Sequence, residues 1–256
     1  MDRQSRLKQR KNRYLLALLL LLLILSFFLH QQITEPVYSP LPEGAYYRVE
    51  TDDKVCTFTF ETVWGEQQTG EILDILDRYQ INATFFVDGA WLRQHADLAR
   101  EIVMRGHEIG LHGYEHKLMT EMDDEELAAD FTKAVNALQT ELDISTNLFR
   151  PPFGELDERV FNFAHSQGFT TVLWSINVQD WLNLTRDELI NKVMKNIHPG
   201  AIILMHTHSA RLTKALPIII QSLQHQDYEI IPFSELCRHE LAVKEEEHAA
   251  PYLWYP

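Results

Sequence analysis

Beyond residue 53, the hydrophobic positions of the chain alternate between two spacings. Short runs rich in β-branched and aromatic residues predict strands at residues 55–60, 83–87, 148–150, 170–176, 201–205 and 228–232. Between these runs, apolar residues recur every three or four positions, which predicts helices at residues 71–80, 97–105, 123–142, 157–167, 185–197 and 213–226. Alternating strands and helices imply an α/β fold with a mostly parallel sheet covered by helices. About seven such units are also enough for closure into a distorted barrel.

The first thirty residues follow a different pattern. Residues 1–13 contain six basic residues and one Asp, a net charge of +5, and residues 14–29 are almost entirely Leu, Ile, Ala and Phe. This apolar run of about sixteen residues lies just below the roughly 17–25 needed to span a bilayer. No small-residue cleavage site follows Phe27, so we expect an uncleaved signal anchor rather than a removed signal peptide. A buried core helix is the other interpretation, but no face of the run is polar.

The chain is therefore predicted to have five parts. They are a basic cytoplasmic segment (1–13), a transmembrane signal anchor (14–29), an extracellular linker containing prolines (30–52), a globular domain (53–240) and an acidic and aromatic tail (241–256). Basic residues before the anchor keep that end in the cytoplasm. We thus expect a single-pass protein of the cell membrane with its domain outside the cytoplasm.

The net charge and the two cysteines indicate which partners and which covalent links to expect. The net charge is −14, and no basic stripe follows residue 13, so nucleic acid is not an expected partner. The acidic charge favours solubility of the domain. Of the two cysteines, Cys56 is expected to be a buried free thiol, and a disulfide with Cys237 is the alternative. Nothing in the sequence indicates the oligomeric state.

Residues able to carry out chemistry follow several of the predicted strands. His112 and His116 are four residues apart and can hold one metal ion between them. Because the carboxyl ends of strands meet at one mouth of a parallel α/β barrel, residues that directly follow strands are expected to lie close together. These residues are Glu61, Arg150 in Arg150-Pro151-Pro152-Phe153-Gly154, Asp180 in Asp180-Trp181, and His206 in Leu204-Met205-His206. The alternatives are a surface position for Arg150 and a purely structural core position for His206.

The order of these motifs, beginning with Thr59-Phe60-Glu61-Thr62, resembles the five motifs of the NodB-type polysaccharide deacetylases. The resemblance covers about residues 53 to 238. Members of that family remove acetyl groups from chitin, peptidoglycan and related glycans. The resemblance implies a distorted (β/α) barrel, a divalent metal cofactor, most often zinc, and a polysaccharide substrate.

Amide deacetylation needs a metal to polarise the acetyl carbonyl, a base, donors for the oxyanion and an acid for the departing amine. By resemblance, His112 and His116 bind the metal, Glu61 is the base, Arg150 holds that base ionised, and His206, oriented by Asp180, is the acid. The implied substrate-binding residues are Phe153 and Gly154, whose backbone faces the oxyanion, and Trp181 and Leu204, which form the wall of the acetyl pocket.

Position 62 departs from the family pattern. The first motif of the family usually reads Thr-Phe-Asp-Asp, and its second Asp joins the two histidines on the metal, whereas this chain has Thr62 there. Three outcomes are open. Glu61 binds the metal, and Glu66 or Asp180 is the base; or the two imidazoles hold the metal together with water; or the site holds no metal.

We therefore expect a membrane-anchored, metal-dependent deacetylase that acts on N-acetyl groups of a cell-wall glycan. The alternative is a glycan-binding protein that keeps the fold without hydrolysis, and position 62 separates the two. An O-deacetylase or another amidohydrolase acting on a soluble sugar would use the same machinery. The run from Glu61 to Glu66, with Trp64-Gly65 inside it, also resembles a subgroup that includes sporulation-associated peptidoglycan deacetylases.

Overall fold

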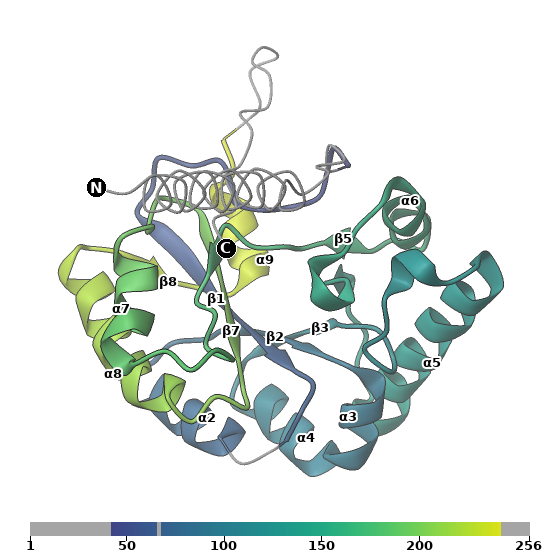
Figure 1. The fold of residues 1–256 in the computed structure, drawn as a ribbon, viewed down its shortest axis with the longest axis horizontal. Coiled ribbons are helices and arrows are strands. Elements are labelled where there is room, and N and C mark those ends of the chain that lie inside the picture. The colour runs from purple at the N-terminus through teal and green to yellow at the C-terminus, as the bar shows by residue number, and fades with distance from the viewer. Residues whose placement is uncertain (1–41, 66–67, 242–256) are drawn as a thin grey trace, which may run out of the picture. The chain divides into compact units, whose positions relative to one another are not determined.

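The computed structural model of the protein describes residues 42–65 and 68–241. Its strands are β1 (Val55–Thr62), β2 (Thr84–Val87), β3 (Glu108–Leu111), β4 (Leu148–Phe149), β5 (Thr170–Thr171), β6 (Ile176–Asn177), β7 (Ala201–His206) and β8 (Glu229–Ile230). Its helices are α2 (Thr69–Arg78), α3 (Gly89–Gln94), α4 (Ala96–Met104), α5 (Asp124–Leu142), α6 (Glu158–Ser166), α7 (Arg186–Met194), α8 (Leu212–His225) and α9 (Phe233–Leu236) (Figure 1). Single 3-10 turns are η1 (Met119–Glu121), η2 (Pro152–Gly154) and η3 (Cys237–His239).

All strand pairings are parallel, in the order β5-β4-β3-β2-β1-β7-β6, with β8 beside the start of β1. The run 170–177 joins the two edges of this sheet. After β5, Val172 N donates to Phe149 O of β4 over 2.8 Å, and before β6, Ser175 N donates to Ile202 O of β7 over 3.0 Å. The predicted strand over 170–176 is therefore two short strands, because it changes partner halfway.

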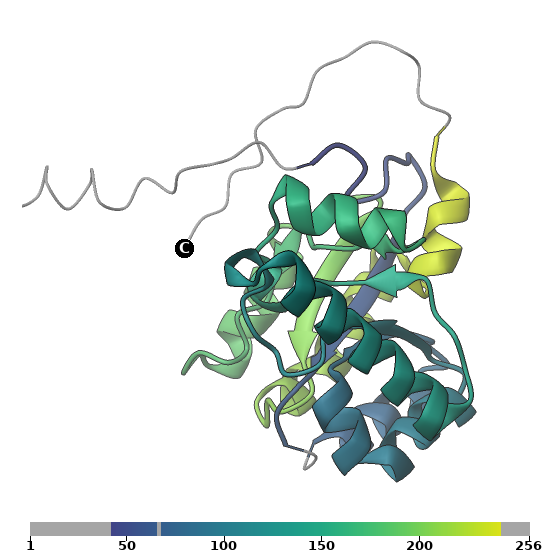
Figure 2. The ribbon, with the colours of Figure 1, turned by 90° about the vertical axis from the view of Figure 1, so that its right-hand side faces the viewer.

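The result is a distorted α/β barrel, as expected. The helices lie around the outside of the strands (Figure 1), and Figure 2 views the barrel from the side that α5 and α6 cover. Burial of β1 follows from its central place. It is paired with β2 and β7 on its two sides, and all eight of its residues are buried. Apolar and polar side chains alternate along it, with Phe58 and Phe60 on one face and Thr57, Thr59 and Glu61 on the other.

Most helix limits agree with the predictions because capping residues set them. Asp123 starts α5 in a capping box with Glu126, and Thr185 starts α7 in a capping box with Glu188. Helix α3 was not predicted. It has only six residues, too few to show a helical period, and it starts where the side chain of Asp88 accepts a hydrogen bond from Trp91 N.

Residues 45–49 cross the barrel at the end where β7 begins. Tyr46 N donates to Thr171 O over 2.9 Å, and Leu173 N donates to Tyr46 O over 2.7 Å. Further along, Val49 N donates to Gly200 O over 2.9 Å. This part of the predicted linker thus packs on the domain and ties β5 to β7.

Replacing Gly200 with Ala is expected to lower the free energy of unfolding by about 3 kcal/mol or more. Gly200 has a φ of +72°, and a Cβ there would lie 1.8 Å from the carbonyl oxygen of Val49, so the crossing segment would have to move. The matched control is Gly70→Ala, because a Cβ at Gly70 meets nothing within 4 Å. Urea unfolding of both variants checks this, and equal stabilities would contradict it.

Several predictions lie outside the described residues: segments 1–13 and 14–29, most of 30–52, and the tail after residue 241. Across residues 42–65 and 68–241, no helix is both long and apolar enough to span a bilayer. Cys56 and Cys237 are both free thiols, so the alternative of a disulfide is wrong. Burial raises the pKa of the Cys56 thiol well above its usual range and that of Cys237, which also faces Glu240, to about 12.

Candidate active site and metal centre

The carboxyl ends of the strands bring the predicted residues together. Glu61 ends the pairing of β1 with β7, where it lies directly opposite His206. Arg150 follows β4, and its backbone N donates to Leu111 O at the end of β3, so His112 lies beside it. All four side chains are buried, together with that of Asp180. Burying charged groups away from water costs free energy, and such a cluster is stable only if opposite charges and hydrogen bonds among its members offset that cost.

Glu61 lies at the centre of this cluster. Its Oε2 is 3.4 Å from His112 Nε2 and 3.3 Å from His206 Nε2, and its Oε1 is 3.7 Å from Arg150 Nη1. Burial would raise the pKa of Glu61, but the two imidazoles outweigh it and hold that pKa well below its usual range. The carboxylate is therefore ionised at neutral pH, as the sequence prediction for Glu61 requires.

His206 is held by Asp180 at two points. The distance from His206 Nδ1 to Asp180 Oδ1 is 2.8 Å, and the backbone N of His206 donates to Asp180 Oδ2 over 3.0 Å. Ser209 Oγ donates to the backbone carbonyl of Asp180 over 2.9 Å and so fixes its loop. Burial lowers the pKa of His206, but Asp180 and Glu61 together raise it to about 9. A protonated imidazole at this place has one N–H on Asp180 and the other directed at Glu61.

Arg150 has a second function that the sequence did not reveal. Its guanidinium donates from Nε to Val172 O over 2.9 Å and from Nη2 to Leu173 O over 2.8 Å, so it also holds the segment that closes the barrel. The guanidinium stacks over Phe86, with its carbon 4.2 Å from the ring centroid. Burial lowers the pKa of Arg150 to about 10 although Glu61 opposes this, so the side chain keeps its charge.

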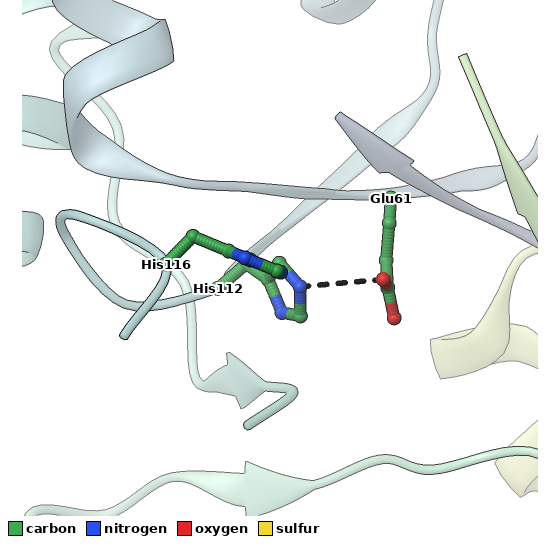
Figure 3. Close-up of side chains that lie close together, drawn as sticks. All are labelled: Glu61, His112 and His116. Atoms are coloured by element: carbon green, nitrogen blue, oxygen red, sulfur yellow. Dashed lines mark ion pairs between the residues drawn. The ribbon is translucent and has the colours of Figure 1, made fainter. Parts of the chain in front are cut away.

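His112, His116 and Glu61 form a set of three candidate metal ligands. One ligand atom from each lies within 4.8 Å of the other two, and Figure 3 shows Glu61 facing the two imidazoles. The loop between the histidines turns sharply, with positive φ at Gly113 and at His116, which brings the second imidazole back beside the first. Burial, followed by repulsion from His112, lowers the pKa of His116 to about 4, so this ring is neutral and able to bind a metal at pH 7.

These residues fit a divalent metal. His112 Nδ1 lies 2.8 Å from the carbonyl oxygen of Arg150, which orients the ring so that Nε2 faces the site. That Nε2 is buried without a hydrogen-bond partner among the described atoms, as a metal ligand would be in a structure without ions. Two imidazoles and one carboxylate suit zinc and related transition metals. Thr62 is buried, and its hydroxyl supplies no anionic ligand.

The predicted substrate-binding residues line the same region. The ring of Phe153 lies 4.4 Å from that of His116, and the ring of Trp181 lies 4.8 Å from that of His206. Both aromatic side chains are about half exposed, at 52% and 45%. Gly154 packs against the indole of Trp174, to which a Cβ would come within 2.4 Å. Leu204 is buried on β7 two residues before His206, and thus on the same face of the strand.

The sequence analysis gave no role in the site to three groups that the structure places there. They are the carbonyl group of Arg150, Trp64, whose ring packs against His116, and His208, whose ring lies 5.5 Å from that of His206. Trp64 follows the first motif by two residues, and the sequence analysis used it only as part of a subgroup pattern. Glu66, one of the alternative bases, lies outside the described residues, and Asp180, the other, is committed to His206.

Comparison with known proteins agrees with this geometry. The family model for polysaccharide deacetylase matches residues 48–172. A peptidoglycan-N-acetylglucosamine deacetylase of Bacillus cereus is 31% identical over 198 residues, which cover 75% of this chain and 92% of that protein. The chain belongs to the polysaccharide deacetylase family.

Two further proteins are similar over comparable lengths. The peptidoglycan-N-acetylmuramic acid deacetylase PdaA of Bacillus subtilis is 31% identical over 199 residues, and 72% of each chain is covered. The uncharacterized protein YlxY of the same organism is 29% identical over 190 residues, which are 74% of this chain and 59% of YlxY. The two relatives named as deacetylases are thus named for different sugars, N-acetylglucosamine and N-acetylmuramic acid.

Among solved structures, BA3943 of Bacillus anthracis, described as a pseudoenzyme of the CE4 family, has a TM-score of 0.75 at 30% identity, over 79% of this chain and 72% of its own. A mutant of BA3943 is described as having restored enzymatic activity. PdaA of B. subtilis has a TM-score of 0.72 at 27% identity, over 75% of this chain and 84% of its own. Thus the polysaccharide deacetylase fold of this chain is shared by active and inactive members.

Proposed function

We propose that the protein hydrolyses N-acetyl groups of a cell-wall polysaccharide, peptidoglycan or a chitin-like glycan, with the help of a divalent metal. The observation that carries this proposal is the position of Glu61, whose carboxylate lies between His112 of the candidate metal site and the His206–Asp180 pair. The proposed base, the proposed acid and the two proposed imidazole ligands thus lie close together. Relatives named as peptidoglycan deacetylases support the substrate class.

His112 and His116 would hold the metal, which when bound polarises the acetyl carbonyl and lowers the pKa of water. Glu61 is the proposed base. Its low pKa keeps it ionised, and Arg150 holds its other oxygen in place. The same carboxylate is the acidic member of the candidate ligand set, so it is close enough to the histidines to serve as a ligand as well.

His206 is the proposed acid. Its Nε2 proton would pass to the nitrogen of the departing sugar amine, which is otherwise a poor leaving group. Asp180 stabilises the charged imidazole and fixes the ring so that Nε2 faces the reacting centre. Backbone of the Phe153-Gly154 turn would stabilise the oxyanion, and Trp181 and Leu204 would enclose the acetyl methyl group.

A second candidate function is glycan binding without hydrolysis. Two observations favour it: the buried Thr62 at the place of a metal-binding Asp in the family pattern, and the similarity to a structure described as a pseudoenzyme. In this case the barrel mouth would still bind a polysaccharide, but water would not be activated there.

We expect the full-length protein to release acetate from chitin oligosaccharides or peptidoglycan fragments with added zinc, cobalt or nickel, and not after chelation. Thr62→Asp is expected to raise kcat/KM about tenfold or more, because it restores a carboxylate at the position where the family pattern has its third metal ligand. The matched control is Thr62→Asn, which has nearly the same shape and no charge. Glycan binding without acetate release by the wild type would support the second candidate.

The proposed place of action is the outer side of the cell membrane. Its support is the basic segment 1–13 followed by the apolar run 14–29. Recovery of the wild-type protein with washed membranes tests this in the same preparation, and full release into the soluble fraction would contradict it.

A further inference from the structure

Trp64 packs beside the candidate site at the carboxyl end of β1. It is two residues beyond β1, and 52% of its side chain is exposed. The centroid of its indole ring is 4.8 Å from that of His116, at an interplanar angle of 72°. The centroid is also 5.7 Å from that of His208, at 78°. His208 in turn lies against His206, so Trp64 connects the candidate metal ligand on one side with the candidate acid on the other.

A hydrogen bond to a buried residue of α3 restrains the loop that carries Trp64. Gly65 has a positive φ of 70°, and its carbonyl oxygen accepts a hydrogen bond of 2.8 Å from the indole Nε1 of Trp91. Trp91 is buried on α3. A buried anchor of this kind fixes the direction of the loop, so the exposed indole is a preorganised surface.

The exposed aromatic residues of the described chain gather at this site. They are Trp64, Phe153 and Trp181, and the ring of each packs against a histidine of the site. An apolar side chain that stays half exposed to water forgoes part of the free energy that full burial would give. A cluster of such side chains on the surface is typical of a binding site.

Two cavities lie next to residues that Trp64 contacts. One, of about 580 Å³, is lined by His116, Phe153 and parts of η1 and α5. The other, of about 380 Å³, is lined by Trp181, His208 and the start of α8. Trp64 contacts one lining residue of each, His116 and His208. Both volumes are in the range of small-molecule sites.

We propose that Trp64 is a substrate-contacting, specificity-determining residue, whose indole packs against the apolar face of a pyranose ring. A glycan chain held there would extend from one cavity to the other and place one acetyl group over the site. The ligand class is an oligosaccharide of several sugars rather than a single sugar. This inference rests on the proposed polysaccharide substrate. Indoles suit the task because they offer a rigid apolar face at little cost in conformational entropy.

The test compares full-length wild type with Trp64→Ala and Trp64→Phe. Trp64→Ala is expected to weaken binding of a chitin tetrasaccharide, measured by calorimetry, about tenfold and to raise KM equally, which is the change typical of a lost binding contact. kcat should stay within about threefold, because the base and the acid are untouched. Trp64→Phe keeps an aromatic face and should restore most of the affinity. Met104→Ala on α4 is the control, since Met104 is 78% exposed and its loss should change nothing.

The outcomes separate this inference from the proposed function. Unchanged tetrasaccharide affinity in Trp64→Ala would overturn the inference and leave hydrolysis unaffected. If Trp64→Ala binds the tetrasaccharide more weakly than wild type and wild type releases no acetate, the inference is supported and glycan binding without hydrolysis is favoured as the function. A wild type that binds no oligosaccharide would overturn it as well. If Trp64→Ala does not fold, as judged by circular dichroism, Trp64→Leu takes its place, and wild-type affinity for the tetrasaccharide in that variant would overturn the inference.

Discussion

Replacing His206 with Ala is expected to lower kcat for acetate release by about 10²–10⁴-fold, the contribution of a positioned general acid. The imidazole is buried, lies 2.8 Å from Asp180 and faces Glu61. Among the described residues, we therefore expect no other side chain to donate the proton in its place. Glu61→Gln should cause a loss of similar or larger size, since it removes the proposed base but keeps the shape of the side chain.

Controls for this prediction lie next to the site. His208→Ala removes an imidazole that packs against His206 but is assigned no proton transfer, and its kcat should stay within about threefold of wild type. Asp180→Asn should move the alkaline limb of the pH profile to lower pH, because loss of the carboxylate lowers the pKa of His206, and an acid with a lower pKa is deprotonated earlier as pH rises. If Glu61→Gln and His206→Ala release acetate as fast as wild type, the assignment of these residues is wrong.

Replacing His112 with Ala is expected to reduce zinc affinity by about hundredfold or more, because it removes one of three candidate ligands from a buried site. Wild type should retain about one metal ion per chain after gel filtration, and the variant close to none. Elemental analysis and zinc titration measure this without any substrate, so the result does not depend on turnover. His225→Ala is the control, since His225 is an exposed imidazole near the end of α8.

The same measurement on Glu61→Gln distinguishes the two roles of Glu61. If Glu61 completes the ligand set, the variant loses metal as His112→Ala does. If Glu61 acts only as the base, the variant keeps its metal and loses turnover. A wild type that takes up no zinc, cobalt or nickel would contradict the metal prediction and favour glycan binding.

The secondary structure was predictable where local rules dominate. Periodicity located α5 and α6, and their starts agree with the structure, in which the side chains of Asp123 and Asp157 cap them. The rules failed where tertiary contacts decide. Helix α3 is too short to show a period, and the run 170–177 is divided because its two halves bond to different strands. The spacing of apolar residues shows which face of a segment is buried, but it does not show which strand that segment pairs with.

By itself, the sequence determined the strand–helix alternation and the order of the motif residues, and hence which side chains gather at the strand ends. It also determined that position 62 has no carboxylate. Only the tertiary structure decided that the Glu61 carboxylate lies within reach of His112, His116 and His206, that the Arg150 carbonyl orients His112, and that Trp64 packs against both His116 and His208. These distances join residues far apart in the chain, and they depend on strand register and on turns with positive φ at Gly65, Gly113 and His116, which no spacing along the sequence encodes.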